Sequence, residues 1–356
     1  MRIADFDYDL PAELIAQRPL EKREAARMLV LNRAQQVWRD SQFAELPTHV
    51  QAGDVVVVNN TRVFPARLVG TREPTGGRVE LFLIRESDKG VWEALTRPAK
   101  RLQKGTRISF GNKLRAEVIE VLDEGRRRVR FDSAESFDAL LEELGQTPLP
   151  PYIKRDQQHI IAADAKQSHE EATNDRARYQ TVYARHSGAI AAPTAGLHFT
   201  TRVIDELAAR GAHIVEVTLH VGYGTFEPVR VDLIDEHKVA PERCEITIEA
   251  ARKINDARAI GNRIFAVGTT TVRALESALD DNGCVRAGAR EANITITPGH
   301  RFQAVDALLT NFHLPRSSLL LLVAAFAGQD FALAAYRHAV AARYRFYSYG
   351  DCMLII

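Results

Sequence analysis

The chain has 356 residues, of which 47 are Lys or Arg and 46 are Asp or Glu. A chain of this length can bury a large core and predicts two domains. Because the charges balance, a nucleic-acid partner would have to be bound by a local basic patch and not by net charge. The three cysteines are far apart, with no CxxC pair, which indicates a reducing compartment and no structural zinc.

The first residues carry acidic side chains where a signal peptide would carry a basic and then an apolar segment. The longest apolar stretch, Leu319 to Ala327, is too short to cross a bilayer and predicts a buried helix. We therefore expect a soluble, cytoplasmic protein without a membrane partner.

The first segment runs from Met1 to about Arg67 and contains a run of four valines, 55–58. Such a run predicts a strand that is buried on both faces. Polar residues follow it directly, and open α/β sheets bind ligands at the carboxyl ends of their strands. Asn60 and Arg62 are therefore candidate ligand-binding residues. An Asx-type turn is the alternative for Asn60, whereas the guanidinium of Arg62 suits a phosphate or carboxylate.

The second segment, 68–150, has short alternating runs between turn signals, which predicts an all-β domain, a small barrel or sandwich. The predicted strands are 78–84, 91–96, 106–110, 114–122 and 127–131. A helix is predicted over 134–144, with Gly145 as its end. The prolines that follow form a stiff boundary.

The third segment, from about 151 to 356, alternates helices and strands, which predicts a mostly parallel α/β arrangement. The predicted strands are 188–192, 213–219, 263–267 and 307–309, and the predicted helices are 201–210, 249–260, 271–279 and 319–327. We expect residues 1–67 and 151–356 to form one discontinuous α/β domain, into which the β-rich segment 68–150 is inserted. The polar stretch 156–175 is predicted to be a loop.

Four short runs in the third segment are dense in Gly, Thr and His, and three of them lie where a strand leads into a helix. The runs are 193–200, 220–226, 268–273 and 310–315. Glycine permits close approach of a backbone, hydroxyls form hydrogen bonds and imidazole can do both, so the combination favours a polar ligand that bears phosphate or sugar. We expect the four runs to build a single site.

The run that begins at Gly268 places Thr269 and Thr270 at the start of a predicted helix. Free amides at a helix start bind anions, and the hydroxyls add donors. A simple N-cap is the alternative. Arg273, in the first turn, pairs either with a carboxylate or phosphate or simply with a surface acid.

Two histidines, His198 and His220, end strand-associated runs near glycines. Imidazole is the side chain best suited to proton transfer near neutral pH, and the alternative is a structural histidine with all its hydrogen bonds made. His313, which precedes Pro315, is more typical of a structural loop. None of the 11 histidines has HExxH or comparable spacing, so we predict no metal.

Basic and aromatic runs offer possible RNA contacts at 97–101, 126–128 and 344–349, although solvated faces and a packed terminal strand explain them as well. The residues taken by themselves indicate an enzyme whose site lies among several loops of an α/β domain. Its substrate would be polar and nucleotide-like, and the reaction stays open at this point.

The four runs and several further segments closely resemble the S-adenosylmethionine:tRNA ribosyltransferase-isomerase family of queuosine biosynthesis. The further segments are 6–11, 59–68, 149–153, 179–184 and 344–351. The resemblance spans nearly the whole chain. It implies an α/β barrel-like catalytic domain that is interrupted by a β-barrel insertion, in agreement with the segments predicted above.

The resemblance also implies a reaction. Enzymes of this family transfer and isomerise the ribosyl part of S-adenosylmethionine onto 7-aminomethyl-7-deazaguanine in the tRNA anticodon, which gives epoxyqueuosine and releases adenine and methionine. The implied partners are that tRNA and S-adenosylmethionine, which is consumed as a substrate, so no cofactor is expected. We expect a monomer. The rival hypotheses are a non-catalytic RNA-binding protein and a methyltransferase, although the chain has no GxGxxG opening of the usual nucleotide-binding kind.

Two kinds of site residue are expected from this resemblance. The proton-transfer residue is His198 or His220. The residues expected to bind substrate are Asn60, Arg62, Thr194, Gly224, Thr225, His237, Glu242, Thr269, Thr270, Arg273, Asn311 and His313. One departure is Ala240, which stands near the place where family members often carry a second histidine.

Overall fold

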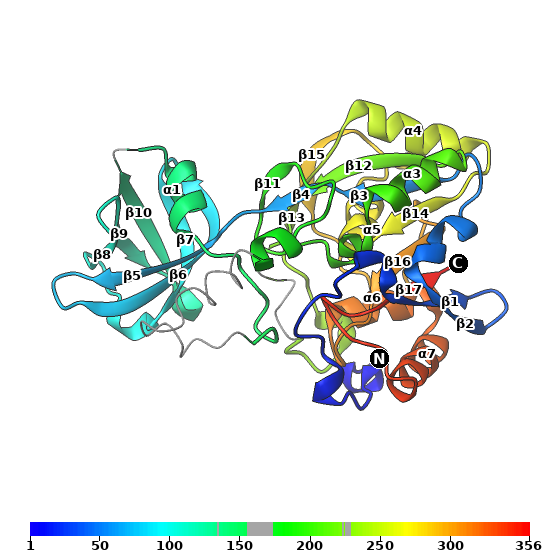
Figure 1. Ribbon diagram of the computed structural model, residues 1–356, viewed down its shortest axis with the longest axis horizontal. Coiled ribbons are helices and arrows are strands. Elements are labelled where there is room, and N and C mark those ends of the chain that lie inside the picture. The colour runs from blue at the N-terminus through cyan, green and yellow to red at the C-terminus, as the bar shows by residue number, and fades with distance from the viewer. Residues whose placement is uncertain (134, 155–173, 223, 225–228) are drawn as a thin grey trace.

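The computed structural model describes residues 1–133, 135–154, 174–222, 224 and 229–356. Its two main features are a nine-stranded sheet and a closed six-stranded barrel. In Figure 1 the barrel lies at one side of the larger α/β part, which contains both termini. The predicted α/β class with a small inserted β-barrel is confirmed. The boundaries 1–67 plus 151–356 and 68–150 stay a prediction.

The nine-stranded sheet has the order β15-β13-β12-β3-β14-β16-β17-β1-β2, with β15 and β2 at its ends. Its strands are β1 (Arg27–Asn32), β2 (Val37–Gln42), β3 (Val55–Asn59), β12 (His213–Leu219), β13 (Glu242–Ile246), β14 (Ile264–Val267), β15 (Gly288–Ala292), β16 (Ala307–Asn311) and β17 (Cys352–Ile355). The parallel arrangement is confirmed for the four central strands, β12, β3, β14 and β16. Outside them β17 pairs with β1 in parallel, and the other neighbours are antiparallel.

Strand β3 explains why the sheet separates two cores. Its five residues are all buried, as the run of valines predicts. Because side chains alternate along a strand, Val55 and Val57 pack into one cluster, whereas Val56 and Val58 pack into the cluster on the other face. Strands that are covered on both faces are typical of the interior of a parallel sheet, and β3 is the fourth strand of the order and lies between β12 and β14.

Five helices cover the two faces of this sheet: α3 (Thr201–Ala209), α4 (Ile248–Ala259), α5 (Thr269–Glu276), α6 (Ser318–Ala327) and α7 (Gln329–Ala341). Helix α3 packs with Val56 and Val58, and the other four contribute to the opposite cluster. Hydroxyl caps begin three of them, since Thr200, Thr247 and Ser317 accept hydrogen bonds from amides three residues further on. The predicted helices are confirmed, and α7 is an addition to them.

The barrel has the closed order β10-β7-β6-β5-β8-β9. Its strands are β5 (Arg67–Arg72), β6 (Gly77–Asp88), β7 (Val91–Arg97), β8 (Arg107–Phe110), β9 (Leu114–Val121) and β10 (Arg126–Ser133). Helix α1 (Phe137–Leu144) packs Leu140 and Leu141 against its core. Strand β5 was not predicted, because Gly70 breaks its apolar pattern. A Cβ at Gly70 would lie 2.5 Å from the carbonyl oxygen of Ser109, so the glycine permits close packing of β5 on β8.

A two-stranded parallel sheet of β4 (Thr61–Val63) and β11 (His186–Ala189) lies apart from the two larger sheets. The strand predicted at 188–192 therefore exists in part, but it does not belong to the main sheet. Short 3-10 helices complete the described structure: η1 (Ile3–Phe6), η2 (Ala12–Leu14), η3 (Arg23–Ala25), η4 (Phe43–His49), η5 (Ala99–Arg101), η6 (Asp123–Gly125), η7 (Thr194–His198) and η9 (Ile234–Glu236).

Within the ranges given above, no single helix has both the length and the apolar composition needed to cross a membrane. Helices α6 and α7 pass this test only when they are taken together, and a bend of 115° separates them. Most of the predicted loop 156–175 falls outside the described residues.

Candidate functional site

The carboxyl ends of the four central strands meet at one edge of the sheet, and a cleft lies there. Each of the four Gly-, Thr- and His-rich runs contributes to its lining, through Thr194, Val221, Thr269 and Asn311 respectively. The cleft has about 540 Å³ of space that is not filled by protein atoms, open solvent at its mouth included. The expectation that four distant runs gather at a single site therefore agrees with the geometry.

The described residues that line this cleft carry no charge at neutral pH. Among the described residues that line it there is no Asp, Glu, Lys or Arg. Three tyrosines, Tyr152, Tyr179 and Tyr347, supply aromatic surface, and the rings of Tyr152 and Tyr347 meet edge to face with centroids 3.9 Å apart. Burial raises the pKa of Tyr347 to about 12, so its hydroxyl keeps its proton at neutral pH. The cleft thus suits a flat, uncharged group.

Helix α5 begins at the rim of the cleft. Thr269 and Thr270 line it, and both also line a smaller adjoining pocket that includes Gly224. The first amides of a helix have no partner within the helix and attract negative charge. The hydroxyl of Thr271 instead donates to the carbonyl of Val267 at 2.7 Å, so the third threonine serves the helix and not the cleft.

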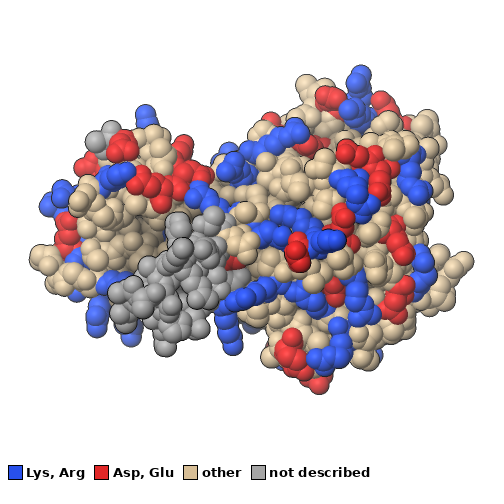
Figure 2. Space-filling model, in the orientation of Figure 1, with Lys and Arg blue, Asp and Glu red and all other residues tan. Residues whose placement is uncertain are grey.

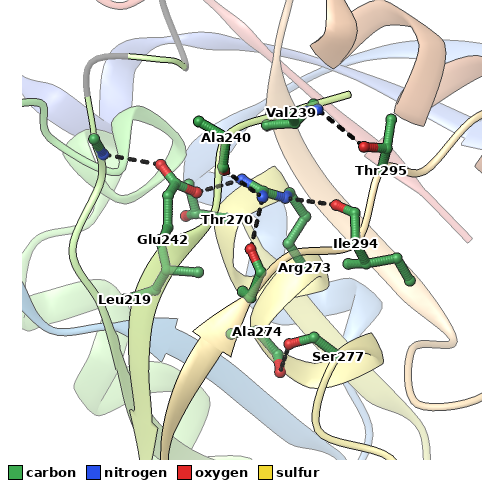
Figure 3. Close-up of polar contacts among 12 residues, drawn as sticks. Leu219, Val239, Ala240, Glu242, Thr270, Arg273, Ala274, Ser277, Ile294 and Thr295 are labelled. Atoms are coloured by element: carbon green, nitrogen blue, oxygen red, sulfur yellow. Dashed lines mark hydrogen bonds and ion pairs between the residues drawn. The ribbon is translucent and has the colours of Figure 1, made fainter. Parts of the chain in front are cut away.

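Arg273 and Glu242 form a buried ion pair behind this helix start (Figure 3). The guanidinium also donates to the carbonyls of Ile294, Ala240 and Ala292, at 3.1, 3.2 and 2.9 Å. The alternative of a surface acid is wrong for Arg273, because the acid with which it pairs is buried. With four of its donors engaged by the chain, Arg273 ties α5 to β13 and β15.

Glu242 also contacts the second run, residues 220–226. Its Oε1 accepts a hydrogen bond from the amide of Gly222 at 2.9 Å, while Oε2 pairs with Arg273. The glycine run is thereby fixed beside α5. Gly224 lies next to the adjoining pocket, where a Cβ would approach that of Ala240 to 2.8 Å. Thr225, the other residue predicted in this run, lies outside the described residues.

His198 lies behind the cleft and not in its wall. Its Nε2 is 3.3 Å from Nδ2 of Asn311, and its ring packs on Phe43 with centroids 5.3 Å apart. Burial lowers the pKa of His198 to about 4, with Arg23 and Arg345 adding to the effect, so the ring is neutral at pH 7. The described contacts make His198 a partner of Asn311, and direct proton transfer by its ring stays a prediction.

His220 lies beside the cleft, next to Val221, which lines it. Its Nδ1 is 2.8 Å from Oγ1 of Thr61, and its ring is half-buried against the backbone of Gly188. Burial lowers its pKa, and Arg243 lowers it further. His220 is thus also biased toward the neutral form, and its role in proton transfer is untested.

His313, which resembled a structural loop residue in sequence, does line the cleft. Its Nε2 is 2.9 Å from Oγ1 of Thr310, and burial lowers its pKa to about 3. His237 lies further away, with Nε2 2.7 Å from Oγ of Ser318 beside the adjoining pocket.

Asn60 and Arg62 are not part of the cleft wall. Asn60 is buried, and its amide donates to Glu216 at 3.0 Å and accepts from Thr218 at 2.7 Å, so β12 takes up its polar groups. Arg62 is exposed and lines a different, wider pocket that also includes Arg176. Figure 2 shows Lys and Arg side chains over the part of the larger lobe that lies next to the barrel.

Two groups of residues at this site were noted in the sequence only as parts of polar or aromatic runs, and they were not among the expected site residues. Asn59 is fully buried and joins β3 to β12 and α5, through Leu219 at 2.9 Å and the hydroxyl of Thr270 at 3.4 Å. The cleft tyrosines come from segments far apart in the chain, and no spacing pattern connects them. In the part of the chain that the structure describes, no three His, Cys, Asp or Glu side chains group as metal ligands would.

The buried histidines predict acid sensitivity. Above pH 6.5, His198 and His313 are neutral in both the folded and the unfolded chain. Below pH 6.5 the unfolded chain binds a proton at each ring, whereas the folded chain does so only near pH 4 at His198 and near pH 3 at His313. We expect the free energy of unfolding, measured in urea, to fall by about 2 kcal/mol per ring between pH 7.5 and pH 5. His198→Gln cannot titrate and should flatten this dependence. An unchanged slope in that variant would contradict the assignment.

The Glu242–Arg273 pair predicts a graded loss of stability. Glu242→Ala leaves a guanidinium buried without its anion and should lower the free energy of unfolding by about 3–5 kcal/mol. Glu242→Gln is the matched control, because its amide oxygen can still accept from Gly222 or Arg273, and it should lose less. Urea unfolding checks both variants. A loss below about 1 kcal/mol for Glu242→Ala would mean that the pair does not anchor this region.

Comparison with known proteins agrees with these observations. A family model described as "Queuosine biosynthesis protein" matches residues 3–355. Relatives from Symbiobacterium thermophilum and Syntrophotalea carbinolica, both named S-adenosylmethionine:tRNA ribosyltransferase-isomerase, are 50% and 49% identical, with full coverage of each chain. A crystal structure of S-adenosylmethionine tRNA ribosyltransferase from Thermotoga maritima is 36% identical, with a TM-score of 0.54, and the match covers 99% of this chain and 100% of that one. The chain therefore belongs to the family of queuosine biosynthesis proteins.

Proposed function

We propose that this chain is an S-adenosylmethionine:tRNA ribosyltransferase-isomerase. It transfers and isomerises the ribosyl part of S-adenosylmethionine onto 7-aminomethyl-7-deazaguanine in the tRNA anticodon, giving epoxyqueuosine and releasing adenine and methionine. The observation that carries the proposal is the cleft in which all four runs meet, in a chain about half identical to relatives of that name. The cosubstrate is consumed, so the reaction calls for no cofactor.

The chemistry begins at the sulfonium, which acidifies the adjacent C5′ hydrogens. A base removes one of these protons to give an ylide, whose electron pair forms a C4′=C5′ double bond as the C4′–O4′ bond breaks. The freed oxygen forms a carbonyl at C1′ as adenine leaves and takes up a proton. The aminomethyl nitrogen of the tRNA base attacks the unsaturated sugar. An internal oxygen finally closes the epoxide as methionine departs. The enzyme must supply a base, a proton donor for adenine and a fixed geometry.

The described residues support these tasks in different ways. The start of α5, with Thr269 and Thr270, is a suitable place for the methionyl carboxylate, because helix starts attract anions. His198 and His220 both have lowered pKa values and hold the basic form at neutral pH. His220 is the more exposed of the two, whereas His198 contacts the cleft wall through Asn311.

The reaction products test the proposal. We expect adenine and methionine to appear in equal amounts when the protein is incubated with S-adenosylmethionine and precursor-bearing tRNA, followed by chromatography of the small molecules. A methyltransferase would give S-adenosylhomocysteine instead, and an RNA-binding protein would bind the tRNA and release neither product. Either result would refute the proposed function.

The helix start allows a matched test. Thr269→Val removes a hydroxyl from the cleft and should lower kcat/KM by about tenfold, the cost of a hydrogen bond to a charged group. Thr271→Val is the control, because that hydroxyl is fully buried and donates to Val267, so its activity per folded molecule should stay within about threefold. Equal losses in the two variants would show that the helix, and not the cleft hydroxyl, sets the rate.

A further inference from the structure

Asn311 has an unusual position among the residues that line the cleft. It ends β16 and is 1% exposed. Its Nδ2 lies 3.0 Å from the carbonyl oxygen of Tyr347 and 3.3 Å from Nε2 of His198. Its Oδ1 is buried and has no hydrogen-bond partner among the described residues. A buried amide oxygen without a partner is rare in folded proteins and calls for an explanation.

The orientation of this amide is fixed by its neighbours. If oxygen and nitrogen were exchanged, an oxygen would face the carbonyl oxygen of Tyr347, which can only accept. His198 reinforces the same choice, because its neutral ring can accept at Nε2. Both N–H groups of Asn311 are therefore engaged by the protein, and only an acceptor is left for a bound molecule.

The residues that line the cleft limit which kind of ligand could donate a hydrogen bond to Oδ1 of Asn311. An ammonium group would need an anionic partner, and no described residue of the wall is an acid. Aromatic faces from Tyr152, Tyr179 and Tyr347 favour a flat group that can stack. A nucleobase with an exocyclic amino group meets both requirements, since its ring is flat and uncharged and its amino group supplies N–H donors.

We infer that Asn311 is a specificity-determining residue whose side-chain oxygen accepts a hydrogen bond from an N–H group of a nucleobase bound in the cleft. The inference rests on the proposed function, which supplies two such bases: the adenine of S-adenosylmethionine, with its 6-amino group, and the target base of the tRNA, with its 2-amino group. His198 and Tyr347 are positioning residues, since their contacts with Nδ2 fix the amide so that Oδ1 is the atom left to accept a hydrogen bond from the ligand.

Equilibrium binding without turnover tests this role in two arms. The first compares S-adenosylmethionine with an analogue that has hydrogen in place of the 6-amino group. The second compares precursor tRNA with tRNA whose target base lacks its 2-amino group. In the arm that contains the true donor, the wild-type protein should bind the deaminated ligand about tenfold more weakly, because Oδ1 is then left unpaired. The arm that shows this ratio identifies the base.

Two variants separate ligand recognition from a structural role. Asn311→Ala removes the acceptor and should bind both ligands of the discriminating pair within about twofold of each other. Asn311→Asp keeps an acceptor oxygen but loses the amide donors, so it should retain the preference while binding both ligands more weakly. If Asn311 served only through its donors, Asp would behave like Ala, and the inference would be wrong.

The remaining outcomes are equally decisive. A wild-type protein without preference in either arm overturns the inference, even if Asn311→Ala does not fold. A preference that persists in Asn311→Ala overturns it as well. A preference that Asn311→Ala abolishes, in a protein that releases no adenine, supports the role of Asn311 and refutes the proposed reaction, so the two failures can be told apart.

Discussion

Parallel pairing of four central strands is the constraint on which the site depends. Because β12, β3, β14 and β16 run in the same direction, their carboxyl ends lie at one edge, and the segments that follow them must leave the sheet there. Residues from four distant parts of the chain thus come together without any direct sequence relation. Burial of β3 on both faces secures this order, since its valines would be exposed to water at any edge position.

Buried polar side chains then fix the loops that leave this edge. Asn59 joins β3 to β12 and α5, and the Glu242–Arg273 pair holds the glycine run beside α5. The polar atoms of these side chains form hydrogen bonds or ion pairs within the chain. Because breaking such a buried contact leaves a polar group without a partner, these contacts favour a single arrangement of the loops. The amide of Asn311 is tied in the same way on its nitrogen side, and its oxygen is the exception.

Much of the fold could be predicted from the sequence, because strong local patterns carry it: the valine run of β3, capped amphipathic helices and alternating strands between turns. The larger sheet is less regular than the barrel-like domain that the resemblance implies, since it has two ends and antiparallel outer strands. The sequence predicted which runs of residues gather at the site, but it did not predict the individual contacts that their side chains make. Arg273 was expected to hold substrate, but whether a guanidinium faces a ligand or a buried acid depends on β13, which is distant in sequence.

The described residues of the cleft wall include no Asp, Glu, Lys or Arg, and this has a consequence for the proposed chemistry. A sulfonium carries a full positive charge, and transfer of a charge from water into a site without a counter-ion is unfavourable. Removal of a C5′ proton converts this cation into an ylide, whose positive and negative centres are adjacent and cancel. Because none of the described wall residues is a carboxylate, the wall that they form penalises the bound cation more than the ylide, and the difference lowers the barrier to the first step. A carboxylate beside the sulfur would bind the cosubstrate more tightly and slow the same step.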